Sequence, residues 1–203
     1  YIYSLFLMRK LILLMLWLVS VTVQAQPLKA RVKIDAERKI GTIDKNLYGN
    51  FTEHLGRCIY GGIYEPTSPE ANGDGFRKDV ITATRDLGVS VVRWPGGNFV
   101  SGYHWQDGIG PKADRPKRKD LAWGDVEPNT VGTDEFLRFA QSAGVEPYLC
   151  VNMGTGTLDE ARNWVEYCNA PTGLYFSDLR ARNGHPAPYK VKYWGLGNEM
   201  DGE

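Results

Sequence analysis

The sequence contains few cysteines and histidines, and it carries no excess of charge of either sign. Three cysteines and three histidines occur in 203 residues, and no two cysteines have the C-x-x-C spacing of a zinc site. The sequence therefore predicts no metal site and no disulfide scaffold. Lysine plus arginine and aspartate plus glutamate both number 24, so the totals indicate neither a nucleic-acid partner nor an anionic-membrane partner.

Long apolar runs are also absent, except for one near the start of the chain. Arg9 and Lys10 precede the run "LILLMLWLVSVTV", and "VQA" follows it. A basic segment, a short apolar run and a small residue at the cut are typical of a secretory signal peptide. We therefore expect residues 1–25 to be upstream read-through (1–7) followed by a signal peptide from Met8 to Ala25. The mature protein would then be exported, to the periplasm or the cell exterior, without a membrane anchor; a retained anchor is the alternative.

Two further segments follow the leader. The stretch "ARVKIDAERKIGTI" alternates apolar and polar residues, which predicts a half-exposed antiparallel strand pair around Val32, Ile34 and Ile40. We assign residues 26–45 to this strand segment and residues 46–203 to a second, larger unit.

Helix and strand patterns alternate in the larger unit. Asp74 is expected to cap a helix that ends at Gly88, and the strand "VSVVRW" follows it. Thr133 is expected to cap the next helix, which ends at Gly144 before the strand "VEPYLCVN". Thr157 opens a third helix, and "VKYWGLG" is the strand after it; the buried face of this third helix would hold Ala161, Trp164, Val165 and Cys168.

This order predicts a parallel sheet with right-handed crossovers, either an open doubly wound sheet or a (β/α)8 barrel. Polar residues at the ends of the apolar strands favour the barrel, because the carboxyl ends of all its strands converge on one face. We therefore predict the first half, about four strands, of a TIM barrel. The strand-end residues are Glu53, His54, Arg93 through Asn98, Asn152, Asn198 and Glu199.

Glu199 is the first candidate for chemistry. A glutamate at a barrel mouth beside apolar Trp194 and Leu196 would be partly desolvated, as suits a general acid. A carboxylate in a structural ion pair is the alternative, and position alone does not separate the two.

Five separated blocks carry a resemblance over residues 31–203: "YGNFTEHLGRCIYGGIYEP", "VRWPGGNFVSGYHWQDGIGP", "LAWGDVEPN", "GTDEFL" and "YWGLGNEMDG". In this order they resemble the α-L-arabinofuranosidases of glycoside hydrolase family 51. Those enzymes are retaining glycosidases on a (β/α)8 barrel. The resemblance implies that a C-terminal β-sandwich follows the barrel, that residues 26–45 supply a strand to it, and that the family often forms homo-oligomers.

The resemblance also implies roles for particular residues. Glu199 would be the general acid/base, and Asn198 would bond the 2-hydroxyl of the sugar. Glu53, Arg93 and Asn98 would bind the terminal sugar, and Trp123 would line the aglycone side. Carboxylate and amide groups suit vicinal hydroxyls, and an aromatic ring suits the apolar face of the next sugar. No cofactor is implied.

Retention requires a second carboxylate about 5 to 5.5 Å from the first. The resemblance places it on the seventh barrel strand, so we expect it beyond Glu203 and expect this chain alone to be inactive. The implied function is removal of terminal α-L-arabinofuranosyl groups from arabinan, arabinoxylan or their oligosaccharides.

Three alternatives remain at this point. The chain could be another retaining glycosidase, such as an endoglucanase or xylanase, or a noncatalytic carbohydrate-binding barrel. A nicotinamide oxidoreductase rests only on "GTGTLD", where Asp159 takes the third glycine position. The basic stretch "KADRPKRKD" is interpreted as a solvated loop.

Overall fold

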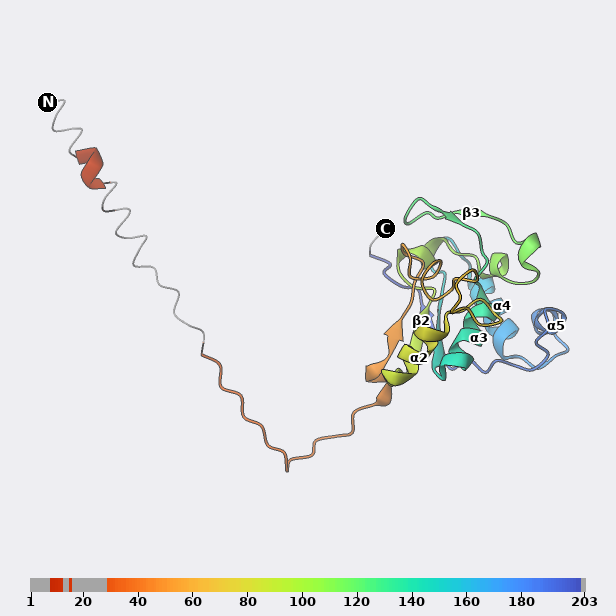
Figure 1. Ribbon diagram of the computed structural model, residues 1–203, viewed down its shortest axis with the longest axis horizontal. Helices are drawn as coiled ribbons and strands as arrows, with labels where there is room; N and C mark the ends of the chain where they lie inside the picture. The colour runs from red at the N-terminus through yellow and green to blue at the C-terminus, as the bar shows by residue number, and fades with distance from the viewer. Residues whose placement is uncertain (1–7, 13–14, 16–28, 202–203) are drawn as a thin grey trace. The chain divides into compact units, whose positions relative to one another are not determined.

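The computed structural model describes residues 8–12, 15 and 29–201 (Figure 1). It divides into two compact units, Tyr1–Thr42 and Ile43–Glu203. Most of the predicted signal peptide lies outside the described residues. Within them, no helix is both long enough and apolar enough to span a bilayer.

The strand pair predicted around Val32, Ile34 and Ile40 does not form. Residues 29–44 contain no strand, and these three side chains are 80 %, 86 % and 91 % exposed. An isolated strand pair is marginally stable in water without a third strand or a helix to cover its apolar face. The predicted membership of this segment in a β-sandwich stays a prediction.

The larger unit is built on a four-stranded parallel sheet, as predicted. Its strands are β1 (Asn50–Phe51), β2 (Val91–Trp94), β5 (Glu146–Val151) and β6 (Tyr193–Leu196), in the order β1-β2-β5-β6. The register sets Phe51, Arg93, Tyr148 and Tyr193 side by side across the sheet. Side chains that are directly abreast in a parallel sheet share a face, so these four form one row.

Helices alternate with these strands along the chain. They are α2 (Lys78–Asp86), α3 (Thr133–Ala143), α4 (Leu158–Asn169) and α5 (Tyr175–Arg182). α2 packs on α3, and α4 packs on α5. Short 3-10 helices and a hairpin fill the connections: η1 (Lys45–Tyr48), η2 (Asn98–Gly102), η3 (Trp105–Gly108), η4 (Lys112–Asp114), β3 (Arg118–Lys119) and β4 (Val126–Glu127).

Two predicted helix starts are wrong, and side-chain contacts explain both. Arg77, not Asp74, is the N-cap of α2, because Asp74 instead pairs with Arg138 at 3.1 Å. Thr133 lies inside α3 as its first residue, since its Oγ1 accepts a hydrogen bond from the indole of Trp164 at 3.0 Å. The predicted cap of α4 is confirmed: Oγ1 of Thr157 accepts from the Glu160 amide at 3.1 Å.

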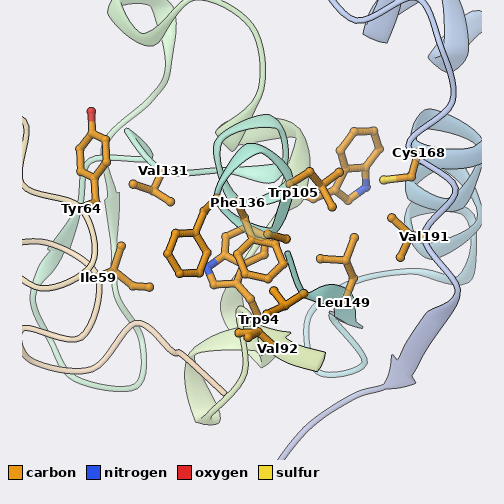
Figure 2. Close-up of a cluster of buried hydrophobic side chains, with 14 of the residues drawn as sticks. Ile59, Tyr64, Val92, Trp94, Trp105, Val131, Phe136, Leu149, Cys168 and Val191 are labelled. Carbon is orange, nitrogen blue, oxygen red and sulfur yellow. The ribbon is translucent and has the colours of Figure 1, made fainter. Parts of the chain in front are cut away.

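Aromatic rings dominate the core between the sheet and the helices (Figure 2). Trp94 stacks on Phe136 with ring centroids 5.0 Å apart, and Trp105 lies parallel to Trp164. Cys168 is buried as predicted. Val165 is exposed, contrary to prediction, because the buried face of α4 centres on Trp164, Tyr167 and Cys168.

The basic stretch "KADRPKRKD" is not wholly solvated, because Arg115 is buried. Its guanidinium makes two hydrogen bonds to the Glu135 carboxylate, at 2.9 and 3.0 Å. Burial by itself would raise the pKa of Glu135, but the bonds and charge of Arg115, together with the Gly132 amide, hold it below its ordinary value. The pair therefore ties the loop after η4 to the first turn of α3.

We expect Arg115→Ala to lower the free energy of unfolding by about 3 kcal/mol at pH 7, because it removes both guanidinium bonds from a buried carboxylate and leaves it only the partly exposed Arg138, at 3.3 Å, as a cationic partner. The lowered pKa of Glu135 means that the pair stabilises the fold above the unfolded carboxyl pKa and that this contribution is lost as the pH falls. The difference between wild type and variant in denaturant unfolding should therefore shrink toward pH 3. Arg118→Ala is the control, since Arg118 pairs with Asp107 in an exposed setting and should change stability little. Equal losses in both variants would contradict the assignment.

Candidate active site

Glu53 and Arg93 meet at the carboxyl ends of β1 and β2. Nη1 of Arg93 lies 3.3 Å from Oε2 of Glu53, and both side chains are largely buried. The Arg93 guanidinium also lies 4.6 Å from the centroid of the Phe51 ring. Two oppositely charged groups are thus held at a strand edge with their remaining bonding positions available to a polar ligand.

The two glycines of "RWPGGN" make room for this pair. Gly96 and Gly97 have φ of 55° and 60°, which strains any residue with a Cβ. A Cβ at Gly96 would stand 1.5 Å from Nη1 of Arg93, and a Cβ at Gly97 would stand 3.1 Å from Oε2 of Glu53. Glycine is required at Gly96 because the guanidinium occupies the place of a side chain.

Two cavities adjoin the ion pair. Arg93 and Asn198 line a cavity of about 470 Å³ along the inner face of the sheet, together with Phe51, Tyr148 and Tyr193. Glu53 lines a neighbouring groove of about 530 Å³. Nδ2 of Asn198 is buried, and no acceptor among the described residues bonds it. The structure therefore brings Arg93 and Asn198 to one cavity, and Glu53 reaches that cavity through its pairing with Arg93. Asn98 follows directly as the first residue of η2.

Glu199 does not have the desolvated setting that its apolar neighbours predicted. Its side chain is exposed, and its backbone adopts a φ of 50°, in the left-handed region. β6 is an edge strand of the four-stranded sheet, so no described strand covers Glu199 from the far side. The following residue, Met200, turns back toward η2, where its sulfur lies 3.6 Å from Oγ of Ser101.

Asn152, expected to be free to bind, instead has a structural role. Its amide donates to the Tyr103 carbonyl at 3.0 Å and its oxygen accepts from the amides of Gly154 and Gly156. It thereby ties the loop after β5 to the segment after β2.

Trp123 lies apart from the ion pair, in the loop between β3 and β4. Its half-exposed ring lines a separate cavity of about 270 Å³ with His54, Tyr60 and Glu127. Glu127 was not predicted as a site residue, although it is a buried carboxylate that bonds both His54 and Tyr60. It lies within the block "LAWGDVEPN", but its bonds could not be inferred locally, because these partners are 73 and 67 positions away in the sequence.

Comparisons with known proteins identify the relatives of this chain. A family model described as "Alpha-L-arabinofuranosidase 1 domain" matches residues 83–202. The chain is 56 % identical over 174 residues to the intracellular exo-alpha-(1->5)-L-arabinofuranosidase 1 of Bacillus subtilis. The aligned region covers 86 % of this chain and 35 % of the relative. Alpha-L-arabinofuranosidase C of Emericella nidulans is 55 % identical over 171 residues, with 84 % and 34 % covered.

The chain belongs to the α-L-arabinofuranosidases of glycoside hydrolase family 51.

Solved structures extend the agreement to the fold. The α-L-arabinofuranosidase of Thermotoga maritima in its arabinose complex superposes with a TM-score of 0.75 at 62 % identity, covering 77 % of this chain and 32 % of that one. The family 51 enzyme of Xanthomonas axonopodis gives a TM-score of 0.79 at 40 % identity, covering 82 % and 34 %. This family 51 chain therefore spans about a third of the length of its relatives, consistent with part of a TIM barrel. Within the described residues, no cluster of metal-ligating side chains occurs.

We expect Gly96→Ala in the full-length protein to lower kcat/KM by about 100-fold, because the added Cβ must displace the Arg93 guanidinium from Glu53. Gly88→Ala is the matched control, since Gly88 also has a positive φ, of 68°, but faces open space at the end of α2. Its strain should cost about 1 kcal/mol of stability and leave the Michaelis parameters unchanged. Unchanged kinetics of Gly96→Ala would show that the ion pair is not part of the site.

Proposed function

We propose that the protein acts as a retaining exo-glycosidase that removes terminal non-reducing α-L-arabinofuranosyl groups from arabinan- or arabinoxylan-type polysaccharides or oligosaccharides. The observation that carries this proposal is the Glu53–Arg93 pair beside the buried, unpaired amide of Asn198. A guanidinium and an amide donor that line one cavity, with a carboxylate paired to the guanidinium, suit the vicinal hydroxyls of a sugar. The names of two relatives, one an exo-acting arabinofuranosidase and one solved in complex with arabinose, support the same substrate class.

In this proposal each site residue has one role. Glu53, Arg93 and Asn98 hold the hydroxyls of the terminal sugar, and Asn198 donates to the 2-hydroxyl. Trp123 packs against the departing part of the substrate. Its half-exposed ring lines a cavity other than the one that Arg93 and Asn198 line, as a residue contacting a different part of the substrate would.

Glu199 acts as the general acid and then as the general base. It protonates the oxygen of the leaving group while a second carboxylate attacks the anomeric carbon, and it later deprotonates the water that hydrolyses the glycosyl-enzyme. The second carboxylate would lie in the two thirds of the relatives' length that this chain does not cover. The exposure of Glu199 fits a site whose other wall comes from that part.

Location and assembly complete the proposal. The basic and apolar pattern of residues 8–25 supports export of the mature protein by a signal peptide. The name of the Bacillus subtilis relative describes that protein as intracellular, so the leader is a point on which the two proteins would differ. A homo-oligomer is proposed from the family resemblance alone.

The first test compares this 203-residue chain with the full-length protein in release of arabinose from an aryl α-L-arabinofuranoside. We expect activity in the full-length protein only, because retention needs both carboxylates. Activity in the short chain would place the second carboxylate within these residues and overturn the proposed division of roles. Binding of arabino-oligosaccharide without hydrolysis by the full-length protein would favour a noncatalytic carbohydrate-binding barrel.

We expect Glu199→Ala in the full-length protein to lower kcat on arabino-oligosaccharides by about 10² to 10⁴. The loss in the glycosylation step should be smaller for aryl substrates, because a good leaving group departs without protonation. Glu146→Gln is the control, since Glu146 opens β5 at the opposite end of the sheet and pairs with Lys192. An equal loss on both substrate classes, measured in the pre-steady state, would be inconsistent with an acid/base role for Glu199.

A further inference from the structure

A second set of buried polar groups lies next to the sugar-binding residues, and neither the proposed mechanism nor the family assignment uses it. His54 follows Glu53 directly in the chain, and Glu127 lies on β4 of the hairpin that carries Trp123. Both side chains are at least 94 % buried, at 3 % and 6 % exposure. Polar groups this deep must be bonded; these two bond each other, and His54 also bonds Trp94 of strand β2.

Only one arrangement of hydrogens satisfies this set. The indole Nε1–H of Trp94 can only donate, and it lies 3.1 Å from Nε2 of His54. Nε2 is therefore the acceptor, and the ring carries its hydrogen on Nδ1, which donates to Oε2 of Glu127 at 2.9 Å. A chain of bonds thus runs from Trp94 through His54 to the Glu127 carboxylate.

The other oxygen of Glu127 is equally committed. Oε1 accepts a short hydrogen bond from the Tyr60 hydroxyl and a 2.6 Å bond from the Asn129 amide. Burial, with the nearby charge of Glu127, raises the pKa of Tyr60 far above its usual value, so the hydroxyl keeps its hydrogen for this bond. Every bond to Glu127 comes from a donor, which requires a carboxylate at this position.

Glu53 and His54 each bond one of two consecutive residues of β2, Arg93 and Trp94. Glu53 pairs with Arg93, and His54 bonds Trp94, the next residue of β2. Consecutive side chains of a strand point to opposite faces, so the segment Glu53–His54 is held to β2 from both faces. The backbone bond from Thr52 N–H to the Arg93 carbonyl, at 3.0 Å, continues the same pairing. His54 also stacks on Phe99, with ring centroids 4.2 Å apart, which limits rotation of the imidazole.

We propose that His54 and Glu127 are positioning residues: they hold Glu53 in its place against Arg93, and they anchor the Trp123 hairpin to the same segment. The proposal rests on the proposed function, since Glu53 and Trp123 are assigned there to the two sides of the scissile bond. The hydrogen bond between His54 and Glu127 fixes the distance between the two sides, because His54 lies beside Glu53 on the terminal-sugar side and Glu127 lies on the hairpin that carries Trp123.

The test uses two variants of the full-length protein that each break one bond of His54. The amide of His54→Asn can still donate to Glu127 from the place of Nδ1 but loses the acceptor for Trp94. The amide of His54→Gln can still accept from Trp94 but loses the bond to Glu127. Each variant should lower kcat/KM on an aryl α-L-arabinofuranoside by about tenfold. His185→Asn is the control, because His185 stacks on Tyr189 outside these cavities, and it should leave kcat/KM unchanged.

A double-mutant cycle with Glu53→Gln separates positioning from a merely structural role. If His54 acts through Glu53, either His54 variant should lose little further activity in the Glu53→Gln background. Additive losses in folded protein, checked by circular dichroism, would overturn the proposal. If one His54 variant fails to fold, the other carries the cycle. A wild-type protein that fails to hydrolyse arabinofuranosides would instead refute the proposed function. An active wild-type enzyme with additive losses would refute only the positioning role of His54.

Discussion

Strand β2 is the element on which the core and the site both depend, because its consecutive side chains point to opposite faces of the sheet. Arg93 faces the cavity and pairs with Glu53, whereas Trp94 faces the helices and stacks on Phe136. The parallel register places β2 between β1 and β5: Val92 and Arg93 pair with β1, and the same two residues, with Val91 and Trp94, pair with β5. A shift of one position would exchange the two faces and bury a guanidinium in the aromatic core, which is energetically prohibitive.

Buried charged or polar groups recur in this fold, and two sets of them join separate segments of the chain. Arg115 connects the loop after η4 to α3, and Glu127 connects the β3–β4 hairpin to the segment after β1. A buried ion pair adds little net stability compared with a well-packed apolar pair, but loss of one partner is costly. Such pairs therefore select one arrangement of the loops over others. That property suits a site whose sugar-binding groups come from several strand ends.

Much of the architecture followed from periodicity and end signals. The alternation of helix and strand predicted the parallel sheet. As expected, Thr157 begins α4 and Gly144 ends α3. The meeting of Glu53 with Arg93 also followed from the barrel prediction, since both stand at strand ends. Failures occurred where a side chain had a stronger partner elsewhere. Thr133 does not cap α3, because its hydroxyl bonds the Trp164 indole, and Asp74 does not cap α2, because it pairs with Arg138.

The sequence by itself determined the order of elements, the family, and which polar residues stand at strand ends, because these are encoded in short-range patterns and in the spacing of motifs. Only the tertiary structure decided which of these groups are buried and what they bond. Glu199 proved to be exposed in the segment after β6, and Glu127 proved to be the shared acceptor of His54 and Tyr60. The physical reason is that burial and hydrogen bonding depend on distances between segments about 70 residues apart, which no local pattern records.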